Sequence, residues 1–227
     1  MLLAIDTSAA ASAALLADDG TTVAAWHEPA ARRHAELLTP ALEELLGGHR
    51  EKIRRIVAGI GPGPFTGLRV GIAAAIGLGL ALDVPVGGVH SADALAHAAL
   101  ARAGDAEALV TVATDARRKE VYWSRYRGMD AAGAPLRIEG PEVSAPAAMA
   151  ATLMPGEVRA GRGFALYPDV LGAPGFPEES LLDPRAEDLG AVAVLRLAAG
   201  QDLLPPRPEY LRRPDAAEQP ARTRRLR

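Results

Sequence analysis

The chain has 227 residues, of which 49% are hydrophobic and 23% are charged, and its formal net charge is −3. A chain of this size and composition can bury a sizeable core as one large or two small domains, so we expect a globular protein. It contains no cysteine, which excludes disulfides, a thiol nucleophile and thiolate metal sites. The slightly negative charge argues against a broad nucleic-acid-binding surface.

We expect no targeting signal at the N-terminus. Met1 leads into a short apolar run that reaches Asp6 at once, without a basic leader or a cleavage site. The longest uncharged apolar run, residues 70–82, contains three glycines and is shorter than the roughly 18 residues that a membrane span needs. We therefore expect a cytoplasmic protein without membrane contact, in which residues 70–82 belong to a buried helix.

The first part of the chain begins with a predicted meander of strands. Apolar runs separated by turn residues predict strands over residues 2–5, 12–16 and 23–26. Apolar residues then recur at helical spacing over residues 34–46, and Gly47-Gly48 ends that helix. Further along, the pattern predicts a strand over 56–60, a helix over 66–82, a strand over 84–89 and a helix from Ser91, as its cap, to about Arg102.

The pattern returns to strands after residues 103–105, so the unit repeats. We expect an N-terminal α/β lobe of residues 1–104 and a C-terminal α/β lobe of residues 105–227. The predicted elements of the second lobe are strands over 109–113, 120–126 and 136–143, a helix opened by Ser144, a short strand with loop over 156–163, a Gly/Pro-rich segment over 167–184 and a helix over 186–199. The chain ends in a basic tail that contains Arg207, Arg212, Arg213, Arg222, Arg224, Arg225 and Arg227.

The most informative segment is the turn of residues 61–69, Gly-Pro-Gly-Pro-Phe-Thr-Gly-Leu-Arg, which leads directly into a helix. A dinucleotide fingerprint would require glycine in place of Thr66, and a P-loop would require a Gly-Lys-Ser/Thr ending. Pro62 and Pro64 also remove two backbone N–H donors from any phosphate nest. We interpret Gly61, Pro62, Gly63, Phe65 and Thr66 as a rigid structural turn, in which Thr66 caps the following helix.

Two helices carry more apolar surface than one sheet can cover. Helix 34–46 spreads its apolar residues over more than one narrow stripe, and helix 66–82 has no charge after Arg69. A stripe of small residues along the second helix lets another backbone approach closely. Packing inside the chain is the alternative, but we favour an interface with a partner subunit. Its predicted residues are His34, Glu36, Leu37, Leu38, Ala41, Leu42, Leu45, Gly67, Arg69, Gly71, Ala74, Ala75, Leu78 and Gly79.

Three motifs coincide in this chain: Ala4-Ile5-Asp6-Thr7-Ser8, His34-Ala35-Glu36-Leu37-Leu38 and the turn of residues 61–69. With Asp115-Ala116-Arg117, Glu120-Val121-Tyr122 and Pro208 before Tyr210-Leu211-Arg212, they resemble the TsaB (YeaZ) family over nearly the whole chain. One departure is Pro64, where that family usually has serine; it keeps the turn stiff but removes a hydroxyl.

The resemblance implies a two-lobed actin-like ATPase (ASKHA) fold, with a mixed sheet flanked by helices in each lobe. It also implies a non-catalytic subunit that pairs with the enzyme TsaD. In that family's pathway, TsaD transfers a threonylcarbamoyl group from threonylcarbamoyl-adenylate to N6 of the adenosine just 3′ of certain tRNA anticodons. The implied partners are TsaD in a heterodimer, the ATPase TsaE in a larger complex, a second copy of the chain in a homodimer, and tRNA indirectly.

The residues agree with a non-catalytic role. TsaD-like relatives hold a metal with two histidines four residues apart on the first helix, whereas here His34 is followed at that spacing by Leu38. No other cluster has metal-ligand spacing, so we expect neither a metal site nor a catalytic residue. The alternatives are a small-molecule kinase or a metallopeptidase of the same fold, and a homodimer whose purpose is not TsaD.

Asp6, Thr7 and Ser8 lie where actin-like ATPases place their first phosphate-contacting hairpin, so they are a vestigial nucleotide-binding candidate. The other interpretation is a strand-ending turn whose side chains bond local backbone, and we favour it because no lysine or further phosphate loop accompanies the motif. We therefore expect no cofactor, with ATP or ADP bound only at a shared interface of the complex. The arginine-rich tail is either a tRNA phosphate contact or a solvated end.

Overall fold

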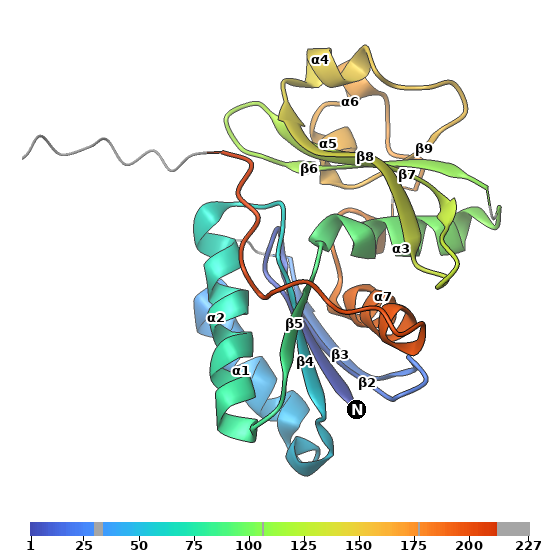
Figure 1. Cartoon of the computed structure of the whole chain (residues 1–227). Helices are drawn as coiled ribbons and strands as arrows, with labels where there is room; N and C mark the ends of the chain where they lie inside the picture. The colour runs from blue at the N-terminus through green and yellow to red at the C-terminus, as the bar shows by residue number, and fades with distance from the viewer. Residues whose placement is uncertain (30–33, 106, 177, 213–227) are drawn as a thin grey trace, which may run out of the picture.

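The structure, a computed structural model, describes residues 1–29, 34–105, 107–176 and 178–212, without the side chains of His34 and Ala35. It contains two mixed β-sheets, and helix α3 (Ser91–Ala103) lies between them (Figure 1). The predicted basic tail after Arg212 lies outside the described residues.

The first sheet has the strand order β3-β2-β1-β4-β5. Its strands are β1 (Leu2–Asp6), β2 (Ala11–Leu16), β3 (Thr22–Glu28), β4 (Arg55–Gly59) and β5 (Val86–Val89). The first three form the predicted antiparallel meander, and β4 pairs in parallel with β1 and β5. This sheet is the frame on which the helices that follow are arranged.

Helices cover both faces of the first sheet. Alternate residues of β1 point to opposite sides: Leu3 and Ile5 meet α1 (His34–Leu46) and α2 (Phe65–Leu82), while Leu2 and Ala4 meet α7 (Ala186–Ala198). Because both faces are covered, every residue of β1 and β2 is buried.

The second sheet has the order β8-β7-β6-β9. Its strands are β6 (Leu109–Asp115), β7 (Val121–Met129), β8 (Pro135–Ser144) and β9 (Val158–Ala160), and only β9 pairs in parallel. Helix α3 covers one face, and the short helices α4 (Pro146–Ala150), α5 (Arg162–Leu166) and α6 (Pro168–Leu171) cover the other. Two 3-10 helices, η1 (Arg50–Lys52) and η2 (Glu179–Leu181), complete the described elements.

The chain returns to the first lobe after the second sheet. Helix α7 follows β9 in the sequence but packs against β1 and β2. The predicted division after residue 104 coincides with the left-handed Gly104 that ends α3, and it assigns α7 to the second lobe. In the structure, α7 instead supplies one of the two helical layers of the first sheet.

The predicted caps are wrong at three helices. Thr66 lies inside the first turn of α2, whose N-cap is Pro64 without a side-chain hydrogen bond. The φ of −59° and ψ of 136° at Pro64 let the chain enter the helix before Thr66 is reached. Ser91 is the first residue of α3, and its hydroxyl bonds Asp6; Ser144 is the last residue of β8.

Helix α2 is not the buried helix that the sequence predicts. It is 18 residues long, and 28% of it is buried. By length and composition alone it is long and apolar enough to cross a membrane. One side packs on β1, β4 and β5, and the other side is exposed at the left of the first sheet in Figure 1. The 81% exposed Leu80 lies on that open side.

Candidate partner interface

The small residues of α2 pack against the chain's own sheet. A Cβ at Gly71 would overlap the Thr7 hydroxyl, and a Cβ at Gly79 would overlap the Val86 side chain. Ala75, between them, is fully buried. The stripe predicted for a partner subunit is therefore used inside the chain, where it brings α2 close to the ends of β1 and β5.

The predicted interface residues of α1 are also mostly internal, since α1 covers β2 and β3. The buried ones are Leu38, Ala41, Leu42 and Leu45, which join the core of the first sheet. Glu36 is exposed and Leu37 is partly exposed. The side chain of His34 lies outside the described residues. Seven predicted interface residues, these four with Gly71, Ala75 and Gly79, thus do not reach the surface.

The open side of α2 lies elsewhere around the helix. Exposed residues on this side include Arg69, Ala73, Ile76, Gly77 and Leu80, and we call these five the outward face of α2. Their spacing of four, three, one and three residues places them on one side of a helix. Gly67, Ala74 and Leu78 of the predicted interface are partly exposed beside this face. Sequence reasoning found Arg69 but missed the other four, because α2 is apolar all round and its periodicity does not show which side the sheet covers.

A hollow continues the outward face of α2 at its C-terminal end. It has a volume of about 600 Å³ and is lined mainly by apolar side chains, among them Ile76, Leu80, Val84, Pro85 and Pro206. The exposed apolar surface of α2 therefore includes a concave region next to the exposed helix face.

The turn before α2 packs on the end of β1. Gly61 has a φ of 105°, in the left-handed region that favours glycine. A Cβ at Gly63 would overlap the backbone carbonyl of Ser8. Gly61, Pro62 and Gly63 are buried, while Phe65 and Thr66 already belong to α2. This close packing joins the start of α2 to the residues after β1.

Asp6 connects the end of β1 to the start of α3. Its fully buried carboxylate accepts hydrogen bonds from the Ser8 N–H at 2.8 Å, the Ser8 hydroxyl at 2.7 Å and the Ser91 hydroxyl at 2.5 Å. Burial raises the pKa of Asp6 above its ordinary value, although the hydrogen bonds from Ser91 and Ser8 act in the opposite direction. These contacts are those of a strand-ending turn.

Thr7 attaches α2 to the same strand end. Its hydroxyl donates to the Gly67 carbonyl at 2.7 Å and accepts from the Gly71 N–H at 2.9 Å. Thr7 and Ser8 are buried. The structure thus brings the Asp6 hairpin and the turn of residues 61–69 together, and the polar groups of the hairpin hold helices.

Residues 204–212, which we call the C-terminal strap, run along β5 toward the start of α2 (Figure 1). Backbone hydrogen bonds join Leu204 to Gly88, and the Glu209 N–H donates to the Ile60 carbonyl at 2.8 Å. The Glu209 carboxylate lies 2.8 Å from His90 Nδ1, and this contact lowers the pKa of Glu209. The strap closes the β5 edge of the first sheet.

The end of the strap reaches both α2 and the second lobe. The Tyr210 ring stacks on Phe65 with 4.4 Å between the centroids. Arg212 donates to the Ala116 carbonyl at 2.9 Å and pairs with Glu120. Of the polar residues noted in the sequence, Arg117 pairs with Asp115 at 2.9 Å, whereas Glu120 joins the strap.

A pocket of about 330 Å³ lies where the strap, the turn before α2 and the β6–β7 turn meet. Its lining combines aromatic rings with guanidinium groups: Phe65, Tyr122, Tyr210, Arg117, Arg118 and Arg212. Residues 117–119 have φ values of 59°, 55° and 60°, which side chains other than glycine rarely adopt. Burial, followed by the nearby charge of Arg118, lowers the pKa of Arg212. The guanidinium groups give the pocket a cationic lining, in which Arg117 and Arg212 are already paired with Asp115 and Glu120.

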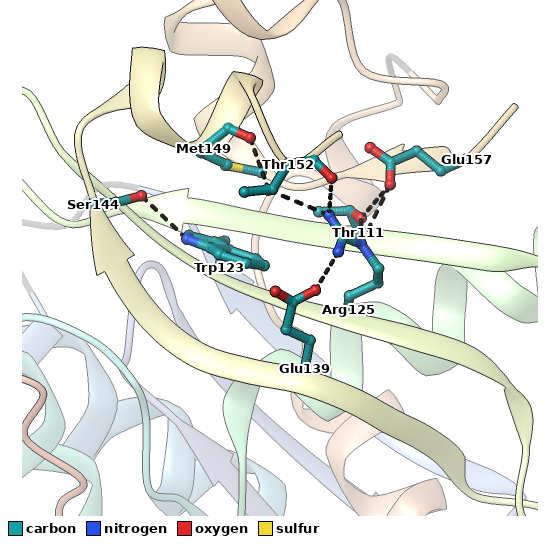
Figure 2. Close-up of polar contacts among 8 residues, drawn as sticks. All are labelled: Thr111, Trp123, Arg125, Glu139, Ser144, Met149, Thr152 and Glu157. Carbon is teal, nitrogen blue, oxygen red and sulfur yellow. Dashed lines mark hydrogen bonds and ion pairs between the residues drawn. The ribbon is translucent and has the colours of Figure 1, made fainter. Parts of the chain in front are cut away.

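A buried polar cluster surrounds Arg125 in the second lobe (Figure 2). Arg125, on β7, is 2% exposed and pairs with Glu139 of β8. Its other nitrogens contact the Thr152 carbonyl at 2.7 Å, the Thr111 hydroxyl at 3.2 Å and the Glu157 carboxylate at 3.5 Å. The cluster joins strands and loops of one lobe, so its role is structural. An arginine inside an apolar strand was the sequence signal for it.

No group of three His, Cys, Asp or Glu side chains within the described ranges could hold a metal ion. The conspicuous features of the molecule are therefore the outward face of α2, the strap and the cationic pocket beside them.

Residues 27–167 match a protein-family model described as TsaD, tRNA N6-adenosine threonylcarbamoyltransferase. The chain is 43% identical over 153 residues to an uncharacterised protein of Mycobacterium leprae. The matched region is 64% of this chain and 39% of that protein. It is 33% identical over 208 residues to the tRNA threonylcarbamoyladenosine biosynthesis protein TsaB of Escherichia coli, and the match covers 88% of each chain.

The solved structure of YeaZ from Pseudomonas aeruginosa is also similar, with a TM-score of 0.75 and 34% identity. The match covers 92% of this chain and 99% of that one. Two mixed sheets flanked by helices, together with this likeness, confirm the predicted two-lobed actin-like fold. Because the sequence matches TsaB and the structure matches YeaZ over most of their lengths, the chain belongs to the TsaB (YeaZ) family.

Proposed function

We propose that the chain is a non-catalytic subunit that binds TsaD and activates it. TsaD would then transfer the threonylcarbamoyl group to N6 of the adenosine next to the anticodon of tRNAs. Family membership supports a role in tRNA threonylcarbamoyladenosine biosynthesis, since the Escherichia coli relative carries that name and the matching family model is that of the transferase.

The observation that carries the binding role is the outward face of α2. Ile76 is 39% exposed and Leu80 is 81% exposed, and Arg69 is the only charged residue of the helix. Removal of apolar surface from water is the dominant favourable term in most protein–protein association. Apolar side chains gathered on one helix face, beside a shaped hollow, are typical of a protein-binding surface.

Activation requires that partner binding favours one arrangement of TsaD over another, because a ligand shifts an equilibrium only by its differential affinity for the two states. We propose that this chain covers apolar helices of TsaD in the active arrangement, and that this contact supplies the difference in affinity. The same face would pair two copies of the chain when TsaD is absent. TsaE and tRNA would join through TsaD, in the cytoplasm.

The chain needs no cofactor of its own in this proposal. The buried groups of Asp6, Thr7 and Ser8 are engaged with helices of the same lobe. ATP or ADP would bind only at a shared interface of the complex, and the cationic pocket beside the strap is the place in this chain whose chemistry suits a phosphate.

The test is complex formation with TsaD by two variants, Ile76→Asp and Leu80→Asp. Each places a charge on the outward face, and we expect the loss of the heterodimer in size-exclusion chromatography, with an unchanged circular dichroism spectrum. The matched control is Leu166→Asp, at a residue of the second lobe that is 47% exposed. A heterodimer that persists in both α2 variants would show that this face is not the interface.

Vesicle flotation tests whether the apolar helix α2 binds a membrane instead. It should leave the wild-type chain in the soluble fraction.

A further inference from the structure

Arg69 is an exposed cation whose orientation is held by two aromatic side chains. Its Cζ lies 3.6 Å from the centroid of the Phe65 ring, and its Nε donates a hydrogen bond to the Tyr210 hydroxyl at 2.9 Å. Phe65 and Tyr210 stack on each other, so the three side chains form one unit. A guanidinium on an aromatic face gains about 0.5–1 kcal/mol at exposed sites. The C-terminal strap therefore fixes a side chain at the start of α2.

The outer end of this guanidinium is open. Arginine has five N–H donors, and the contact with Tyr210 uses the one on Nε. Within the part of the chain that the structure describes, no carboxylate forms an ion pair with Arg69. The two Nη groups remain as a planar fork, whose geometry matches the two oxygens of a carboxylate.

The surroundings of Arg69 select a protein as the occupant. Arg69 begins the outward face of α2, and the face continues through Ala73, Ile76 and Leu80 without another charge. A nucleic-acid backbone would satisfy the cation but leave these apolar side chains in water. A protein that presents apolar residues and one acidic residue would satisfy both. An acidic group beside the first turn of α2 also interacts favourably with the helix dipole.

We infer that Arg69 is the polar anchor of the outward face of α2, and that it binds an aspartate or glutamate carboxylate of the partner protein through both Nη groups. The ion pair fixes the register in which the partner's apolar residues meet Ile76 and Leu80. Phe65 and Tyr210 are positioning residues, which hold the guanidinium without touching the carboxylate. This inference rests on the proposed function, in which the partner is TsaD.

Because Arg69 is already ordered in the free chain, little side-chain entropy is lost when the partner binds. Arginine is also among the residues that most often dominate binding energy at interfaces. We therefore expect one side chain of this face, rather than its total area, to contribute a large share of the specificity.

The experiment measures the dissociation constant for TsaD by titration calorimetry, at low and at high salt. Arg69→Met should weaken binding by about tenfold or more, and should reduce the salt dependence. Arg69→Lys should bind TsaD little better than Arg69→Met does, since an ammonium group does not reproduce the planar fork. Tyr210→Phe keeps the ring but removes the hydroxyl, and should weaken binding by about a few-fold through lost preorganisation.

The matched control is Arg102→Met. Arg102 is an exposed arginine of α3 that pairs with Glu178 at 2.9 Å, and its loss should leave the affinity for TsaD unchanged. Thermal unfolding of every variant checks that the fold is kept.

A charge exchange identifies the carboxylate. Arg69→Glu should abolish binding, and replacing one acidic residue on the contacting face of TsaD with arginine should restore it. The inference is overturned if Arg69→Met binds as tightly as the wild type, or if no exchange restores binding. It is overturned as well if Arg69→Met weakens the homodimer of this chain but leaves the affinity for TsaD unchanged. Loss of binding in Leu80→Asp, with unchanged binding in Arg69→Met, would reject the anchor but keep the proposed function. Unchanged binding in Ile76→Asp, Leu80→Asp and Arg69→Met would reject both.

Discussion

Asp6 has a buried carboxyl group at the end of the first strand, and its titration should be visible in the stability of the chain. Burial raises its pKa above the ordinary value of 3.8. A raised pKa in the folded state means that the protonated form favours folding. The contribution of this group is therefore fully present below 3.8 and is lost as the pH rises through its folded-state pKa.

Asp6→Asn removes this titration and keeps an acceptor for Ser8. We expect the free energy of unfolding of the wild type, minus that of the variant, to increase as the pH falls from neutral toward 3.8. Urea denaturation at a series of pH values measures the difference. A difference that is constant, or that grows as the pH rises, would contradict the assignment of the shift to burial.

Two glycines of α2 make a matched pair on opposite sides of the helix. Gly71→Ala would press a methyl group into Thr7, and we expect it to destabilise the chain by about 1–3 kcal/mol. Gly77 has nothing within 4 Å of an added Cβ, so Gly77→Ala should stabilise the helix by about 0.5–1 kcal/mol. Urea denaturation of the isolated chain measures both. Changes of the same sign in the two variants would mean that the two sides of α2 are wrongly assigned.

Helices α1 and α2 show what could be predicted for an element from the sequence. The leucine spacing of α1 predicts its first and last residues correctly, because apolar periodicity and the two glycines at its end coincide. The orientation of α2 could not be predicted, because a helix that is apolar all round gives no periodic signal. Packing in the tertiary fold decides which side is inside, as the close contacts of Gly71 with Thr7 and of Gly79 with Val86 show.

The incorrect caps have a related cause. Thr66 and Ser91 are good capping residues in isolation, but the backbone before each of them is already positioned by other contacts. Pro64 starts α2 early, and the Ser91 hydroxyl is used by Asp6. Local propensity therefore predicts a helix start to within a residue or two, and tertiary contacts decide which side chain performs the cap.

Asp93 joins the two lobes through one buried carboxylate. It lies on α3, is 1% exposed, and accepts hydrogen bonds from the Tyr126 hydroxyl of β7 at 2.8 Å and from Arg196 of α7 at 2.6 Å. Burial, followed by the charge of Asp93, raises the pKa of Tyr126 well above its ordinary value. The phenol is thereby kept as a hydrogen-bond donor to Asp93.

Removing this carboxylate should destabilise the whole molecule. Asp93→Ala leaves Arg196 and Tyr126 without their partner, and we expect a loss of about 3–5 kcal/mol in the free energy of unfolding. The control is Glu178→Ala, which breaks the exposed pair with Arg102 and should cost about 0–1 kcal/mol. Equal small losses in both variants, by urea denaturation, would show that Asp93 does not hold the lobes together.

The two-lobed organisation could be predicted because a strand-first pattern begins twice in the chain. The return of α7 to the first sheet could not, since an apolar stripe on a helix does not show which sheet it covers. The partners of Asp93 and Arg125 lie far along the sequence from each of them, so the sequence does not show which groups these side chains contact, although an arginine within a strand indicates a polar cluster. The interface residues predicted on α2 are partly buried against the first sheet, and the exposed residues of that helix became evident only from the packing.

The central claim is that this chain activates TsaD through the outward face of α2. The most direct measurement is tRNA threonylcarbamoylation by the matching TsaD and TsaE, supplied with threonylcarbamoyl-adenylate, in the presence of the wild-type chain, of Leu80→Asp or of no chain. We expect modification with the wild type, and only the level seen without the chain in the presence of Leu80→Asp. Equal modification in all three reactions, with no TsaD complex formed, would contradict the claim.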